Sequence, residues 1–166
     1  MCTSSTKKED NDIKYNNIDR IYVTYFCGAI DTDVAIKCEE IAAIQEIHPE
    51  NDYSTPFTQV VDTFIVDTSA INRIDSLIKL KQPISDFRTD ARMYVTIKYK
   101  NGNISNICLG NNTTPSIPKA MINNEYYMLE NELVYILRYY SGYYKWFKED
   151  QLSYFKELQD TTYIKK

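Results

Sequence analysis

Stretches in which apolar and polar positions alternate predict the strands of this chain. Residues 18–30, rich in β-branched and aromatic side chains, and the alternating residues 34–38 flank a short polar turn, so we expect them to form a hairpin. In that hairpin Cys27 would lie opposite Cys38, which leaves open a disulfide between them or two buried thiols. A further run, 60–67, predicts a third strand.

The strongest strand signal is a pair of alternating runs over 91–110 that flank an Asn-Gly pair. A three-residue loop with Gly102 in the left-handed conformation would place Val95 opposite Ile107. This register sorts apolar from polar side chains better than a strict two-residue turn does. We therefore expect a bulged turn at Gly102, with Cys108 on the face away from Val95.

Apolar residues with helical spacing predict four helices, and these two kinds of pattern together define the fold class. The predicted helices are 39–47, 68–83, 130–140 and 149–160. A smaller hairpin is expected over 119–129, turning at Asn123-Asn124. The order of strands and helices predicts a single α+β domain over 18–166, with a mainly antiparallel sheet and helices packed on one of its faces.

The aromatic run RYYSGYYKWF, residues 138–147, permits two interpretations. The preceding helix can continue through Gly142, or Gly142 can end it as a left-handed cap. We favour the break, because an interior glycine costs a helix about 1 kcal/mol. Tyr143, Tyr144 and Trp146 would then lie in an irregular connector and are candidates for a binding surface, the alternative being that these rings form part of the core.

Composition and charge narrow the class of protein. The chain has 166 residues, 43% of them hydrophobic, which suits one folded domain. The net charge is −4 and no stretch of the sequence concentrates Lys and Arg, so we expect no nucleic-acid partner. No apolar run approaches the ~18 residues that a membrane span requires.

The sequence offers little chemistry for catalysis or for a metal site. The four cysteines form no C-x-x-C pair, and the chain has one histidine. The sequence contains no glycine-rich phosphate loop, G-x-S-x-G elbow or H-E-x-x-H motif. The one local acid–base group, Glu46, His48 and Glu50, falls in a polar loop. We expect no catalytic residue, metal ligand or cofactor.

The first 17 residues are polar and charged and predict a flexible tether. Cys2 followed by Thr, Ser and charged residues resembles the mature start of a bacterial lipoprotein. That resemblance implies that Cys2 carries a lipid, that the membrane is reached only through this anchor, and that the protein resides in the cell envelope. The alternative is an ordinary tail on a cytoplasmic protein.

The second half of the chain resembles small uncharacterised lipoproteins of Bacteroidetes, in which a D-x-R run enters an Asn-Gly hairpin followed by a Tyr-rich segment. The residues are Asp90, Arg92, Asn101, Gly102, Tyr126 and Tyr127. We therefore expect a non-catalytic binding or accessory module of the cell envelope, whose partner is an unknown protein or small ligand. The alternative is an immunity-type or inhibitor protein that neutralises a toxin or an enzyme by surface complementarity.

Overall fold

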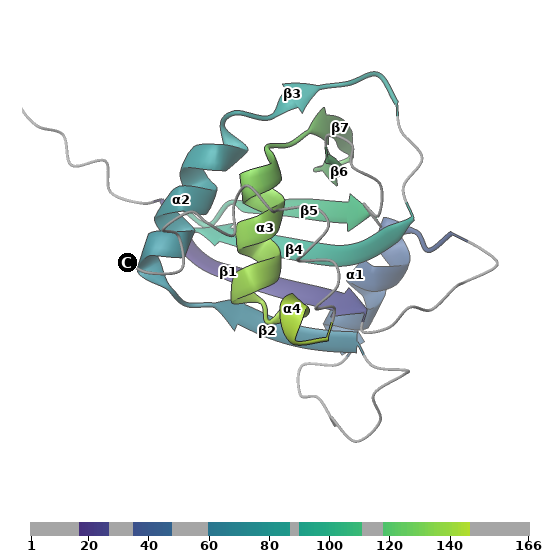
Figure 1. Ribbon diagram of the computed structural model, residues 1–166, viewed down its shortest axis with the longest axis horizontal. Coiled ribbons are helices and arrows are strands. Elements are labelled where there is room, and N and C mark those ends of the chain that lie inside the picture. The colour runs from purple at the N-terminus through teal and green to yellow at the C-terminus, as the bar shows by residue number, and fades with distance from the viewer. Residues whose placement is uncertain (1–16, 27–34, 48–59, 87–89, 111–117, 147–166) are drawn as a thin grey trace, which may run out of the picture.

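The computed structural model describes residues 17–26, 35–47, 60–86, 90–110 and 118–146. Its centre is a seven-stranded antiparallel sheet with the strand order β2-β1-β4-β5-β6-β7-β3 (Figure 1). The strands are β1 (Ile18–Phe26), β2 (Val60–Ile65), β3 (Gln82–Pro83), β4 (Ala91–Tyr99), β5 (Ile104–Gly110), β6 (Lys119–Ile122) and β7 (Glu125–Met128). The α+β class and the antiparallel sheet are therefore confirmed.

The helices do not all lie on one face of the sheet. On β4, Met93, Val95 and Ile97 are buried in the main core, which also includes the apolar faces of α2 (Thr68–Ile78) and α3 (Asn131–Tyr140). Helix α1 (Cys38–Ile47) instead lies behind the sheet in Figure 1. The expectation of a single helical face was therefore wrong for α1.

A small second core explains the position of α1. Ile41 of α1 is fully buried in a cluster with Cys38, Ala91 and Cys108, and Tyr94 packs against this cluster. Tyr94 and Cys108 alternate with the strand residues of the main core, so they point to the opposite face of the sheet. An apolar patch on that face thus gives α1 a surface to cover.

The predicted hairpin of 18–30 with 34–38 was wrong. Strand β1 lies between β2 and β4, with Ile21 opposite Ile65 and Val23 opposite Val95. In this position β1 is paired on both sides, and its inward side chains are almost fully buried.

The D-x-R run has a structural role next to β1 and α1. The backbone amide of Ile36 donates to Asp90 Oδ1 at 3.0 Å, and the Ala91 amide donates to the Ile36 carbonyl at 2.8 Å. Arg92 Nη1 donates to the same Asp90 oxygen at 2.7 Å. These bonds attach the residues just before α1 to the start of β4. The sequence pattern predicted a strand over 34–38 for this segment.

One disulfide joins Cys38 to Cys108, across 70 residues of sequence. It links the start of α1 to β5, and both cysteines are buried. Neither sequence alternative anticipated this pairing, because both assumed that Cys38 lies on a strand beside Cys27. Cys27 lies outside the described residues.

Both predicted turns are confirmed. Val95 lies opposite Ile107, and Gly102 has φ 86°. The β6–β7 hairpin turns at Asn123 and Asn124, which have φ 49° and 68°. Asparagine tolerates this left-handed region better than most residues with a side chain.

The helix boundaries differ in detail from the expected ones. Helix α2 starts at Thr68 as expected, but it ends at Ile78 and its cap is Asp67, whose carboxylate accepts from the Ala70 amide at 2.8 Å. Helix α3 begins one residue later than predicted. The predicted helix 149–160 and the tether with Cys2 lie outside the described residues. Among the helices that the structure describes, none is long and apolar enough to span a bilayer.

The bulged turn generates a stability prediction. We expect Gly102→Val to lower the free energy of unfolding by at least about 1 kcal/mol, because a β-branched residue resists positive φ. No neighbouring atom lies within 4 Å of the position that a Cβ would take, so the cost arises from the backbone conformation alone. Gly102→Asn should cost less. Denaturant titration measures both, and equal, negligible losses would contradict the turn.

The disulfide generates a second prediction. Closing a loop of this length, 70 residues, is expected to contribute about 4 kcal/mol. Adding a reductant should therefore lower the denaturation midpoint of the wild-type protein. A Cys38→Ala/Cys108→Ala variant should start from the lower midpoint and show no further change on reduction. A wild-type midpoint that is insensitive to reductant would refute the bond.

Candidate functional site

The aromatic run 138–147, which begins in the last turn of α3, contains a helix break, as predicted. Helix α3 ends at Tyr140, and Gly142 follows with φ 78°. The Gly142 amide donates to the Tyr139 carbonyl at 3.1 Å, which satisfies one of the last carbonyls of the helix. Residues Tyr143–Trp146 then form the short helix α4 rather than the irregular connector that we expected.

Tyr143 and Tyr144 belong to the core, so they do not fit the proposed binding surface. Their exposed fractions are 5% and 7%. The Tyr143 ring meets Tyr25 of β1 edge-on at 5.6 Å, and the buried Arg138 guanidinium lies 4.7 Å from its centroid. The break turns the chain back onto the end of the sheet, which buries both rings. The side chain of Trp146 lies outside the described part of the structure.

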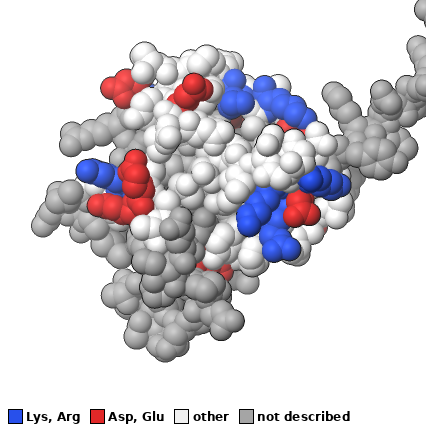
Figure 2. Space-filling view, turned by 180° about the vertical axis from the view of Figure 1, so that it is seen from behind, with Lys and Arg blue, Asp and Glu red and all other residues white. Residues whose placement is uncertain are grey.

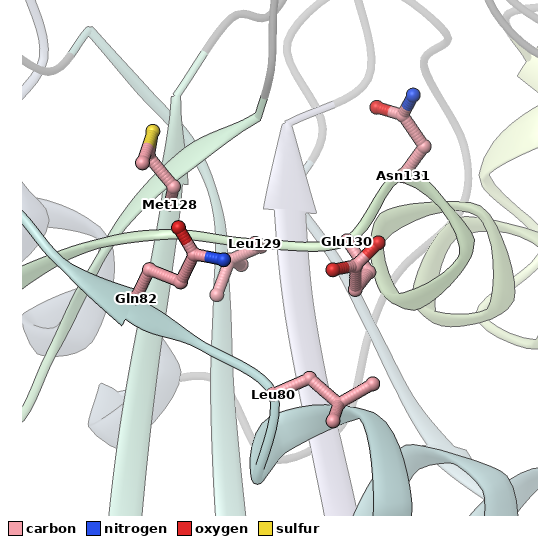
Figure 3. Close-up of a pocket in the computed structure, with 6 residues that line it drawn as sticks. All are labelled: Leu80, Gln82, Met128, Leu129, Glu130 and Asn131. Atoms are coloured by element: carbon pink, nitrogen blue, oxygen red, sulfur yellow. The ribbon is translucent and has the colours of Figure 1, made fainter.

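One surface hollow is small and lies between the end of α2 and the start of α3 (Figure 3). Its volume is about 180 Å³, and its lining includes Leu80, Gln82 and Glu130. Figure 3 shows Asn131 pointing away from the other five side chains. The hollow is smaller than the several hundred Å³ of typical ligand pockets, and its polar groups do not converge.

The second hollow lies beside the disulfide and has a volume of about 220 Å³. Its lining includes Tyr94, Asn106 and Asn123. The Asn123 carboxamide oxygen accepts from the Asn106 backbone amide at 2.8 Å, so this side chain holds β5 to the β6–β7 turn. The side-chain oxygen of Asn123 therefore has a structural role in the fold.

A third hollow is larger than these two, about 560 Å³, and we call it the basic groove. It lies at the end of the sheet where β1 begins and β2 leads into α2. The residues that matter most in its lining are Ile18, Arg20, Phe64, Val66, Ile71 and Lys100. It is open, it combines apolar side chains with cations, and its size falls within the usual range of binding pockets.

An aromatic stack at this groove stands partly in solvent. Tyr22 and Phe64, on neighbouring strands, stack with their ring centroids 4.7 Å apart. The Arg20 guanidinium lies 5.5 Å from the centroid of Phe64. Phe64 nevertheless remains 48% exposed, and Val66 is 82% exposed. The ring is thus held in a fixed orientation while much of its surface is available for contact.

Three cations gather next to this stack, one on β1 and two at the end of β4 and in the turn that follows it. Arg20 lies directly opposite Lys98 in the β1–β4 register, and Lys100 follows two residues later. Asp19 also lines the groove, but within the described residues none of the three cations forms an ion pair. Figure 2 shows several Lys and Arg side chains on the right-hand part of the rear face, with an acidic side chain among them.

Placing Arg20 opposite Lys98 costs stability, because like charges that face each other across two strands repel. The protein as a whole is acidic, with a net charge of −4. A local group of cations without ion pairs among the described residues therefore differs in sign from the net charge of the chain. Ile104, exposed to 55%, lies opposite Lys98 on the next strand and extends this surface with a further apolar side chain. A ligand that carries an anionic group beside apolar groups would therefore complement this surface better than water does.

Sequence reasoning missed this groove for an identifiable reason. The cations are separated along the chain, and only the β1–β4 pairing brings Arg20 to Lys98. We had assigned β1 to a hairpin with 34–38 instead. The available signal was the alternation itself, which places Arg20 and Phe64 on the polar faces of their strands, where a large aromatic side chain is unusual.

The structure shows no group of three or more His, Cys, Asp or Glu side chains positioned to hold a metal ion, as far as its described residues extend. His48 and Glu50 lie outside them. Comparisons with protein-family models, curated proteins and solved structures find no match to this chain.

The burial of Tyr144 generates a third prediction. Burial raises the pKa of its phenol against the opposing effect of the nearby Arg138 guanidinium, and the hydroxyl has no hydrogen bond of good geometry among the described groups. Removing an unsatisfied buried hydroxyl should cost nothing, so we expect Tyr144→Phe to be as stable as the wild type or more stable. Tyr144→Ala should lose ~3–5 kcal/mol through the cavity that it leaves.

Thermal and denaturant unfolding of the two variants would measure the difference. If Tyr144 were instead a surface residue, both substitutions would leave stability within a few tenths of a kcal/mol of the wild type. A large loss for Tyr144→Phe would show that the hydroxyl has a partner.

Proposed function

We propose that this protein is a non-catalytic binding module of the cell envelope, and that its basic groove receives a partner protein. The observation that carries the proposal is the combination of exposed apolar side chains, Phe64 and Val66, with three cations that form no ion pair among the described residues. Aromatic residues and arginine are enriched among the residues that dominate binding energy at protein interfaces.

The stacking of Phe64 supports binding on energetic grounds. Binding costs free energy whenever a side chain must be immobilised, by about 0.5–1.5 kcal/mol for each flexible side chain. Phe64 is already held between Tyr22 and the Arg20 guanidinium, so little of that cost remains. A partner that covers this ring gains its apolar area and meets a cation already in place.

The disulfide supports the proposed location. Disulfides persist in oxidising compartments such as the periplasm and the cell surface, and they are rare in a reducing cytosol. The Cys38–Cys108 bond joins two elements far apart in sequence and is buried, as structural disulfides of secreted domains are. We further propose a lipid on Cys2 as the membrane anchor.

A photocrosslinking experiment tests the binding proposal. A benzoylphenylalanine residue at position 64 replaces one aromatic ring with another, and position 80 is a matched control because Leu80 is exposed to 55% and lies away from the groove. On irradiation of host cells, position 64 should give a discrete protein adduct that position 80 does not give. Arg20→Glu should remove that adduct.

Two results would contradict the proposal: the same adducts at both positions, or no adduct at position 64. The identity of a crosslinked partner also decides between the sequence-based alternatives. A cognate toxin would place the protein among inhibitors, and a component of the envelope would support the accessory role.

The proposed location has a separate test. When host cells are treated with a membrane-permeant alkylating agent, Cys38 and Cys108 should remain unlabelled until a reductant is added. Mass spectrometry of the same protein should show a diacylglycerol-modified or triacylated Cys2. Labelled thiols and an unmodified Cys2 in the cytosolic fraction would overturn the location and the anchor together.

A further inference from the structure

Strand β2 borders the basic groove and is an edge strand of the sheet that the described residues form. We propose that the partner binds through an extended acidic segment that pairs with β2 and adds an eighth strand to the sheet. This inference rests on the proposed function and specifies its partner class.

The two edges of the sheet differ in how they resist such pairing. At one edge β3 has only two residues, and one of them is Pro83, which cannot donate a hydrogen bond. Short strands and proline are ordinary means of protecting an edge. Strand β2 at the other edge has six residues and contains neither Pro nor Lys.

The backbone of β2 is regular. Its register with β1 runs from Val60 to Ile65 without a bulge or a shift. In an antiparallel ladder alternate residues direct their N–H and C=O groups to one neighbour, and the other residues direct theirs to the opposite side. The groups of β2 that do not face β1 therefore form a regular row along the other side of the strand, where no described strand pairs with them.

The charge on β2 does not protect this edge. Its only ionisable residue, Asp62, is buried and accepts a hydrogen bond from Thr24 Oγ1 at 2.5 Å. The carboxylate is thus engaged with the neighbouring strand, and it is only slightly exposed. An edge that lacks an exposed charge, a bulge and a proline is open to strand addition.

Arg20 defines the charge of the incoming segment. Its guanidinium lies over the Phe64 ring, so the positive charge is carried from β1 across to the edge strand. Lys100 lines the same groove. A segment paired with β2 would place alternate side chains on this face, where an apolar side chain can cover Phe64 and an Asp or Glu can meet Arg20.

The test begins with a phage-displayed library of random peptides about ten residues long, a length that spans a strand. The target is the folded, oxidised protein. We expect enriched peptides in which apolar residues alternate and an acidic residue recurs at a fixed place. Binding of the synthesised peptide should weaken about tenfold or more on Arg20→Glu, whereas Lys37→Glu, an exposed cation next to α1, should have little effect.

Backbone methylation then tests the mode of binding. Single N-methyl groups placed along the selected peptide should weaken binding about tenfold at every second position and leave the intervening positions nearly unchanged, because only alternate amides would face β2. The side chains are the same in every derivative, so this period of two reports on the backbone alone.

Each other outcome overturns a defined part of the argument. No enriched peptide, or peptides that are basic, would refute an acidic segment as the ligand. Peptides that are sensitive to Arg20→Glu and insensitive to methylation would refute strand addition and leave the groove as the binding site. Peptide binding without a crosslink at position 64 in cells would remove the proposed function while confirming that the edge accepts a strand.

Discussion

The position of β1 between β2 and β4 is the constraint on which the rest of the structure depends. Its inward side chains Ile21, Val23 and Tyr25 are almost fully buried, and they face the helical layer. The Tyr25 hydroxyl donates to the Ser141 carbonyl at 3.1 Å, which ties β1 to the end of α3. The same strand carries Arg20 and Tyr22 on its other face. One strand therefore organises the main core, holds the end of α3 and positions the charged surface.

The two faces of the sheet have different surroundings, because successive side chains along each strand point to opposite faces. The face under α2 and α3 is apolar along its length, whereas α1 and its disulfide cover only part of the opposite face. The remaining part carries the Tyr22–Phe64 stack and the cations. A surface that a helix covered would have no reason to retain a half-exposed phenylalanine. Among the described residues this end of the sheet therefore stays uncovered, as the binding that we propose for it requires.

Local features of the fold could be predicted from the sequence, and non-local ones could not. The register at Gly102 and the break at Gly142 follow from a few neighbouring residues, since turn geometry and helix propensity act over short distances. The partners of β1 and of Cys38 are set by packing between segments that are distant in sequence. The sequence pattern instead favoured a local hairpin of 18–30 with 34–38. The same holds for the site. Tyr143 is buried because Tyr25 and Arg138 meet it, and Arg20 faces Lys98 because of a long-range register.

The central place of β1 also determines how the domain responds to mechanical force. A load that enters the fold at Asn17 and acts along β1 must shear this strand against β2 and β4 at once. In that direction the hydrogen bonds of both ladders share the load, because they lie perpendicular to the strand. A hairpin at the edge of a sheet would instead open one bond at a time. The rate of forced unfolding is then set by the barrier for removing a central strand from the sheet. A domain that is pulled from the start of β1 therefore resists the force until the whole sheet gives way.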